Sequence, residues 1–401
     1  MSIIQPISAL HSEMTAWRRD LHAHPEIAFE EHRTAQFVAE KLATFGIPVH
    51  RGLAQTGVVG SLKVGSGKRV VGLRADLDAL PIQESNTFEY RSRNAGRMHA
   101  CGHDGHMAML LGAAKHLAVS RNFDGTVHFI FQPAEESRGG GRAMVEDGLF
   151  DRFPVDAVFG LHNWPGLPVG EFGVMPGPMM ASSDEFEIQI TGRGGHAAMP
   201  HQTIDPIVVG SQVVQSLQAI VSRNANPVDA AVITVTQFHA GDAINVIPGG
   251  ALLRGTARAF RPAVQDLIEE AIRRVCSGVA AAHGARITVR YERRYPPTIN
   301  TPAEADLAAN VMREIVGAEN VHTDLAPTMG AEDFAFMLQV KPGAYAWIGN
   351  GPGEGGCMLH NPSYDFNDAI LPLGATYWTR LAETFLGPTT DGARRRPGRR
   401  A

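Results

Sequence analysis

The chain passes from an apolar run into two adjacent carboxylates in Val127-His128-Phe129-Ile130-Phe131-Gln132-Pro133-Ala134-Glu135-Glu136. The apolar part predicts a buried strand, and Pro133 ends it. Successive strand residues point to opposite faces, and the turn after Pro133 separates the two carboxylates further. One glutamate can therefore bind a metal ion while its neighbour faces a substrate as a general base.

Other residues of the types that bind metals follow comparable transitions in the chain. They occur in Met98-His99-Ala100-Cys101-Gly102-His103-Asp104-Gly105-His106, in Gly160-Leu161-His162-Asn163 and in Leu359-His360-Asn361-Pro362. Glycines beside Cys101 and His103 let the backbone bend closely around one ion. Helical spacing begins at Asp104, and His162 follows a short apolar strand. Open α/β sheets place their sites at the carboxyl ends of strands, so this pattern predicts a metal site there.

Length and composition describe an ordinary globular protein of about two domains. The chain has 401 residues, of which 44% are hydrophobic and 19% charged, and a net charge of −5. This balance gives no basis for binding nucleic acid or an anionic membrane, and the Arg-rich stretch 393–400 is interpreted as a solvated end. The N-terminus lacks a signal-peptide pattern, no apolar run is long enough to span a bilayer, and three cysteines make no disulfide framework. We therefore expect a cytoplasmic protein.

The first and last parts alternate strands with helices, which predicts an α/β fold with a mostly parallel sheet and helices on both faces. Within it, Gly57–Val64 and Arg69–Asp76 are predicted to pair around the turn Gly65-Ser66-Gly67. From Asp184 the order becomes βαββαβ, the ferredoxin-like arrangement of a self-contained α+β unit. We expect a discontinuous metal-binding catalytic domain (1–183 and 296–401) that carries an inserted lid or dimerisation domain (184–295).

Ordered motifs along nearly the whole chain identify a family resemblance. The chain resembles the dinuclear metal-dependent aminoacylase and carboxypeptidase superfamily, and within it the amidohydrolase branch of hippurate hydrolases, N-acyl-amino-acid deacylases and auxin-conjugate hydrolases. The matching stretches are 18–26 (RRDLHAHPE), 73–81 (LRADLDALP), 101–106 (CGHDGH), 131–136 (FQPAEE), 192–198 (GRGGHAA), 245–248 (NVIP), 330–334 (GAEDF) and 360–362 (HNP).

The resemblance implies two divalent ions per chain, manganese, zinc or cobalt, held by five ligands: Cys101, His103, Glu136, His162 and His360. Cys101 would bridge the ions as a thiolate. The peptidase branches have a histidine ligand where this chain has Asp76, which makes broad peptidase activity less expected. Asp78 would orient a ligand from behind.

The resemblance also implies a mechanism, in which a metal-activated water attacks an amide and Glu135 moves its proton to the leaving amine. His196 would donate to the oxyanion from the inserted domain, after domain closure or from a second subunit. Asn245 and Arg258 are candidates for binding the substrate carboxylate, since a guanidinium matches that group. Arg258 alternates with Arg254 along one predicted strand, and either can instead be an exposed strand residue.

The expected activity is hydrolysis of small N-acyl-amino acids by a homodimer or homotetramer. An N-acetyl-diaminopimelate-type deacetylase and a dipeptidase or carboxypeptidase would use the same machinery. A cysteine hydrolase based on Cys101 and His103 would leave the other ligand residues unexplained. A binding protein without catalysis would have no need of Glu135 and the full ligand set.

Overall fold

The computed structural model describes residues 1–352 and 358–388, so the Arg-rich end of the chain lies outside the described residues. The chain divides into two compact units. The first comprises Met1–Gly177, Ile299–Ala326 and Asp333–Ala401, and the second comprises Pro178–Thr298 and Pro327–Glu332. The short strands β7 (Gly177–Met180, four residues) and β14 (Thr298–Asn300, three residues) lie at points where the chain passes from one unit to the other.

The first unit is built on a sheet that has eight strands among the described residues, in the order β1-β2-β4-β3-β5-β16-β6-β15. Its central strands β4, β3, β5 and β16 are parallel, and antiparallel pairs occur toward both edges. The strands are β1 (Val49–Leu53), β2 (Gly57–Val64), β3 (Val70–Asp76), β4 (Gly125–Gln132), β5 (Ala157–Pro165), β6 (Phe172–Gly173), β15 (Val321–His322) and β16 (Gly343–Gly351). Every residue of β16 is buried, as expected of a strand covered on both faces.

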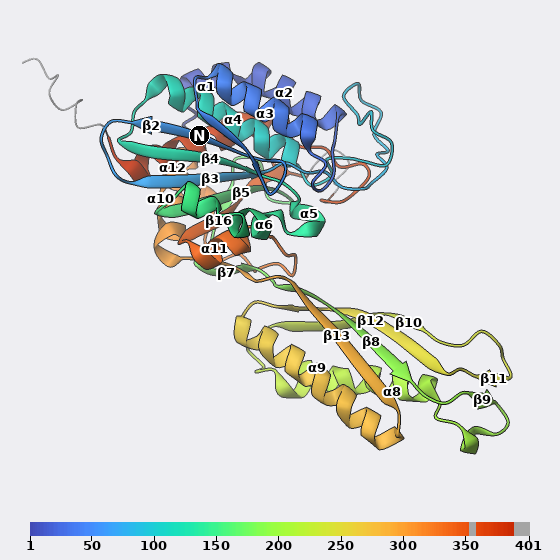
Figure 1. The fold of residues 1–401 in the computed structure, drawn as a ribbon. Helices are drawn as coiled ribbons and strands as arrows, with labels where there is room; N and C mark the ends of the chain where they lie inside the picture. Colours follow the sequence, from blue (N-terminus) through green and yellow to red (C-terminus); the bar gives the residue numbers. More distant parts are fainter. Residues whose placement is uncertain (353–357, 389–401) are drawn as a thin grey trace, which may run out of the picture. The chain divides into compact units, whose positions relative to one another are not determined.

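Helices cover both faces of this sheet (Figure 1). The long α4 (His103–Ser120) and α12 (Leu371–Leu386) pack on each other and share one apolar core with α2, α3 and α10. On the other side, α6 packs against α11. The remaining bounds in this unit are α1 (Gln5–Ala9), α2 (His11–Ala23), α3 (His32–Thr44), α5 (Glu135–Arg138), α6 (Gly140–Glu146), α7 (Leu149–Arg152), α10 (Pro302–Val316) and α11 (Ala335–Val340). The predicted fold class is confirmed.

One predicted strand pairing is wrong. β2 and β3 do not pair with each other, because β4 lies between them, antiparallel to β2 and parallel to β3. The apolar side chains of β4 need cover on both faces, and a central place in the sheet supplies it. The turn at Gly65–Gly67 ends β2 without making a hairpin.

The second unit has the predicted βαββαβ order and an antiparallel sheet in the order β10-β12-β8-β13, which is ferredoxin-like. Both helices cover the same face of the sheet, where Ile188, Val213, Leu253 and Ile272 form its core. Pro262 opens α9, and Gly284 ends it at a positive φ of 64°. The elements are β8 (Ser183–Thr191), α8 (Pro206–Ala219), β10 (Ala231–His239), β12 (Gly250–Ala259), α9 (Pro262–His283) and β13 (Arg286–Tyr295).

Within the described part of the chain, no helix has both the length and the apolar character that crossing a membrane requires.

Candidate metal centre

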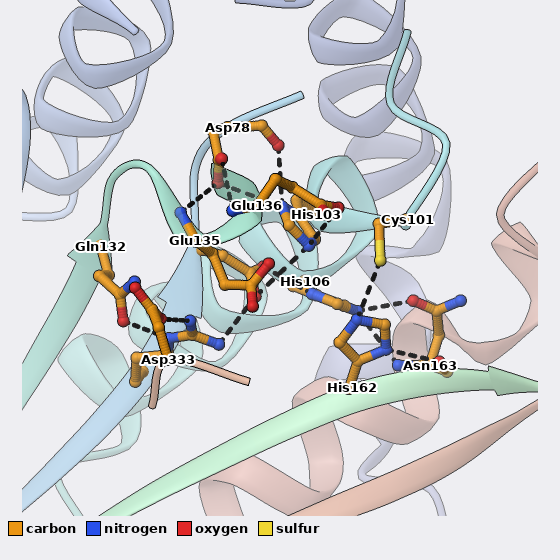
Figure 2. Close-up of polar contacts among 12 residues, drawn as sticks. Asp78, Cys101, His103, His106, Gln132, Glu135, Glu136, His162, Asn163 and Asp333 are labelled. Carbon is orange, nitrogen blue, oxygen red and sulfur yellow. Dashed lines mark hydrogen bonds and ion pairs between the residues drawn. The ribbon is translucent and has the colours of Figure 1, made fainter. Parts of the chain in front are cut away.

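The site residues of the first unit come from the carboxyl ends of neighbouring strands and the loops that follow them. Asp76 ends β3, Glu135 and Glu136 open α5 after β4, and His162 lies in β5. Cys101 and His103 lie where the chain enters α4. Because β3, β4 and β5 are parallel, these side chains meet at the carboxyl ends of the strands. Figure 2 shows Cys101, His103, Glu135, Glu136 and His162 gathered there.

Two tight turns position the candidate ligand residues. Gly102 has a φ of 94°, and a Cβ there would lie 2.2 Å from the Asn163 Oδ1 atom, so only glycine fits between Cys101 and His103. Ala134 has a φ of 55°, which a residue with a side chain rarely adopts. Its N–H donates to Glu31 at 2.9 Å, which holds the turn that separates Glu135 from Glu136.

Asp78 supports both glutamates from below. Its two carboxylate oxygens accept hydrogen bonds from the backbone N–H groups of Glu135 and Glu136, each at 3.0 Å. Its backbone carbonyl accepts from Nδ1 of His103 at 2.8 Å. A carbonyl can only accept, so the Nδ1 atom carries the proton and the Nε2 lone pair of a neutral His103 is free for a metal ion.

His162 is oriented in the same way. Its Nδ1 atom donates to the carbonyl of Asn163 at 2.6 Å, and its Nε2 atom lies 3.3 Å from the Cys101 sulfur. Burial, and then the neighbouring His106, lower the pKa of His162 well below its ordinary value. The ring is thus kept neutral, as a ligand must be.

The potential ligand atoms form groups that fit two ions. Within each group the atoms lie within 4.8 Å of one another, and three of the five groups among the described residues are Cys101/His103/His162, Cys101/Glu136/His360 and His103/Glu135/Glu136. The other two are Asp76/His103/His106 and Glu135/Glu332/Asp333. Cys101 belongs to two of these groups, so its sulfur lies close to both sets of candidate ligand atoms. His360 approaches Glu136 at 3.3 Å and has a positive φ of 64°.

Two buried atoms of this cluster also lack hydrogen-bond partners among the described residues: Nε2 of His103 and Oε1 of Glu136. Buried polar atoms without partners are uncommon and point to an ion or a water molecule. Thiolate, imidazole and carboxylate donors together suit zinc, cobalt or manganese. The residues therefore fit a pair of divalent ions.

The electrostatics favour positive charge at the same place. Burial opposes protonation of His103, yet Asp76 and Asp78 raise the pKa of this histidine to about 10. Burial, reinforced by Glu136 and Glu135, raises the pKa of the Cys101 thiol well above its usual range. Without a cation this cysteine stays a thiol, and a divalent ion is the means by which a thiolate can form here.

A hydrogen-bonded network next to the candidate ligands was not predicted from the sequence. His106 contacts Asp76 at 2.6 Å and the Asn163 side chain at 2.7 Å, and its ring centroid lies 4.5 Å from that of His162. Arg74, fully buried, binds Asp76 at 2.8 Å and Gln132 at 2.9 Å. The only sequence signal for His106 is its position three residues after His103, on one face of α4.

The second unit brings together two of its three predicted site residues. His196 lies in the short strand β9 (Gly195–His196), opposite Val246 of β11 (Val246–Ile247). The carbonyl of Asn245 accepts from the N–H of Ala197 at 3.0 Å, so Asn245 and His196 are neighbours, and both are exposed.

Arg258 lies at the far end of this unit. It is eight residues along β12 from Gly250, the end near β11, which corresponds to roughly 26 Å. Its guanidinium donates to the Thr256 hydroxyl at 2.7 Å and makes no ion pair with a described carboxylate. One small carboxylate therefore cannot contact Asn245 and Arg258 of the same chain in this conformation.

Comparisons with known proteins agree with these features. Residues 72–384 match the peptidase family M20/M25/M40. The chain is 43% identical to a hippurate hydrolase of Campylobacter jejuni, over 96% of this chain and 100% of that protein. It is 48% identical to an N-acyl-L-amino acid amidohydrolase of Geobacillus stearothermophilus, over 73% of this chain and 80% of that one. A dinuclear metal-binding peptidase of the M20 family from Bacillus subtilis has a similar crystal structure, with a TM-score of 0.83, 36% identity, and coverage of 94% of this chain and 99% of that chain.

Proposed function

This chain belongs to peptidase family M20/M25/M40, and we propose that it hydrolyses the amide bond of small N-acyl-amino acids, releasing a carboxylic acid and a free amino acid. The observation that carries the proposal is the buried cluster in which Glu135 lies beside Nε2 of His103 and Oε1 of Glu136, two atoms without a hydrogen-bond partner among the described residues. The names of the two amidohydrolase relatives supply the substrate class. The first unit would be the catalytic domain, with segment 184–295 as a lid or dimerisation domain.

Two divalent ions (manganese, zinc or cobalt) bound by Cys101, His103, Glu136, His162 and His360 would lower the pKa of a water molecule and polarise the amide carbonyl. Glu135 is buried, and Asp78 fixes its backbone next to Glu136. It would accept the proton of the attacking water and return it to the leaving nitrogen. His196 would donate a hydrogen bond to the carbonyl oxygen as negative charge develops on it.

Arg258 would bind the substrate carboxylate, since its guanidinium is partly buried and forms no close ion pair with a described carboxylate. Asn245 would help to bind the substrate as well. Because these two residues are too far apart in one chain, we propose that they reach a given substrate from different subunits of a homodimer, which can also assemble as a tetramer. A cytoplasmic location fits the free thiols of Cys101 and Cys276.

Exposed apolar side chains support a second copy of the chain as the partner. Met199, Ile244 and Val246 flank His196 and Asn245 and are all exposed. Further exposed apolar residues lie on α8 and on the sheet-edge strand β10: Ile207, Val208 and Phe238. An apolar surface of this kind marks an interface, and an edge strand can pair with its copy.

A cysteine hydrolase is disfavoured, because Cys101 holds its proton in this site and its sulfur is placed for ions. The first experiment measures hydrolysis of N-acetyl, N-benzoyl and longer N-acyl-amino acids by metal-stripped protein, with and without added manganese, zinc or cobalt. Cleavage that depends on added metal supports the proposal. Equal cleavage with and without metal, or no cleavage with two ions bound, rejects it.

Glu135→Gln tests the general base. It should lower kcat by about 100-fold to 10,000-fold with metal content unchanged. Glu146→Gln, on the exposed face of α6, is the matched control.

For Arg258→Ala, we expect KM to rise more for substrates with a free carboxylate than for the same substrates blocked as amides. An equal rise for both kinds would contradict the assignment of Arg258.

A further inference from the structure

An aromatic row lies beside His162 on the same face of the sheet. In the parallel pairing of β5 with β16, Trp347 is opposite His162, and alternate residues of each strand share a face. The ring centroid of His162 lies 6.5 Å from that of Trp164 and 6.3 Å from that of Tyr345. Trp164 and Trp347 are stacked, with their ring centroids 4.3 Å apart and an interplanar angle of 17°.

The two indoles of this stack differ in exposure. Trp347 is buried, with 2% of its surface exposed, whereas Trp164 is partly exposed. Trp164 comes two residues after His162, so it lies about 7 Å further toward the carboxyl end of β5. The candidate metal ligands gather at the carboxyl ends of these strands. Trp164 therefore adds a flat apolar surface beside the candidate metal centre.

A second feature of the stack is a buried donor. The indole Nε1 atom of Trp347 has no hydrogen-bond partner among the described residues. Buried indole N–H groups normally find an acceptor, so this one points to a bound molecule or a water molecule beside the stack.

We infer that Trp164, backed by Trp347, forms the subsite for the acyl group and favours planar aromatic acyl groups over acetyl. This inference rests on the proposed function, in which His162 is one of the residues that would hold the ions polarising the amide carbonyl. The amino-acid carboxylate is assigned to residues of the second unit, so the acyl group is the half of the substrate that remains for the first unit.

The dimensions are compatible with stacking. In a benzoyl group the ring centre is about 3 Å from the carbonyl carbon, and aromatic pairs contact favourably at centroid separations of about 4.5–7 Å. An indole centred 6.5 Å from a ligand ring is therefore within reach of a benzoyl ring whose carbonyl faces that ligand. An acetyl group at the same place would leave most of the Trp164 surface without a contact.

The test compares kcat/KM for N-benzoylglycine and N-acetylglycine in wild type, Trp164→Leu and Trp164→Phe. We expect the wild type to prefer the benzoyl substrate. In Trp164→Leu the ratio of benzoyl to acetyl kcat/KM should fall about tenfold, whereas Trp164→Phe, which keeps an aromatic face, should retain most of it. Trp17→Phe, a buried tryptophan on α2, is the control, and its ratio should equal that of the wild type.

A second readout is inhibition by the free acids. Benzoate should inhibit the wild type more strongly than acetate does, and Trp164→Leu should remove most of that difference. If the wild type cleaves both substrates and the Leu variant keeps the wild-type ratio within twofold, the subsite assignment is wrong, and so it is if the wild type prefers acetyl. If the metal-loaded wild type cleaves neither, the proposed function itself fails.

Discussion

Replacing Asp78 by asparagine tests how the site is held together. The Asp78 carboxylate is fully buried, and its two oxygens each accept one backbone N–H, from Glu135 and Glu136. Asparagine keeps one acceptor oxygen and turns the other into an NH₂ group. One of the two backbone donors would then face another donor, and the remaining hydrogen bond would lose the charge of its acceptor.

The magnitude follows from these two bonds. A hydrogen bond to a charged group contributes about 1.5–3 kcal/mol, and a neutral one about 1 kcal/mol. Losing one charged bond and weakening the other should therefore lower the free energy of unfolding by about 3 kcal/mol. The affinity for metal should fall by about 10-fold to 100-fold, because Asp78 also orients His103 through its backbone carbonyl and its carboxylate lies 3.4 Å from the Nδ1 atom.

The assay is calorimetric unfolding of the metal-free protein together with a competitive zinc titration. Asp156→Asn is the control, since the Asp156 carboxylate accepts a single backbone N–H, from Val70 at 2.8 Å, at an exposed position. We expect that control to lose less than about 1 kcal/mol. If Asp78→Asn unfolds like the control and binds zinc as the wild type does, Asp78 does not hold the site.

Three further outcomes are expected. Burial lowers the pKa of His128 to about 4, so protonation favours the unfolded chain; its contribution is complete above the ordinary pKa of 6.5 and is lost as the pH falls toward 4. Relative to His128→Gln, the wild type should lose about 2 kcal/mol between pH 7 and pH 5 in urea unfolding, and parallel pH profiles would contradict this. A Cβ at Gly140 would lie 1.7 Å from the Pro133 carbonyl oxygen, so Gly140→Ala should lower the free energy of unfolding by about 2 kcal/mol or more and reduce activity. Gly278 in α9 has open space around it, so Gly278→Ala should raise the free energy of unfolding by about 0.5–1 kcal/mol. Chelation should lower the melting temperature of the first unit, and added metal should restore it. A melting temperature that changes with neither treatment would argue against bound ions.

The fold could be predicted where local patterns decide it. The apolar run of β4 and the βαββαβ order of the second unit are strong periodic signals, and both elements form as predicted. The prediction that β2 pairs with β3 was wrong because it rested on the local turn between them, whereas strand pairing depends on the whole sheet. A strand that is apolar on both faces takes a central position in a sheet. β4 occupies that position between β2 and β3, although it begins about 50 residues after β3 ends.

The site shows the same division. Motif spacing identified residues whose ligand atoms do meet, such as Cys101, His103 and His162. It could not identify the contact of Asp76 with His106, because the two residues are 30 positions apart and the contact exists only once β3 and α4 are packed. Nor could it reveal the stack of Trp164 on Trp347, since these two residues are 183 positions apart and become neighbours only when β5 pairs with β16.

The distance between Asn245 and Arg258 raises the question of which chain supplies His196 to a given metal centre, because His196 is a neighbour of Asn245. If His196 acts on the metal centre of a partner subunit, Glu135→Gln and His196→Ala should complement each other. In an equal mixture about half of the dimers are mixed, and each of these has one site with both residues intact, so about a quarter of the wild-type activity should return. If His196 acts on its own chain after closure, every site in the mixture lacks one residue and no activity returns. The two variants are unfolded and refolded together, and as a control each is refolded alone. Activity that returns only after refolding together would assign His196 to the partner subunit's site. Its absence in demonstrably mixed dimers would assign this residue to its own chain.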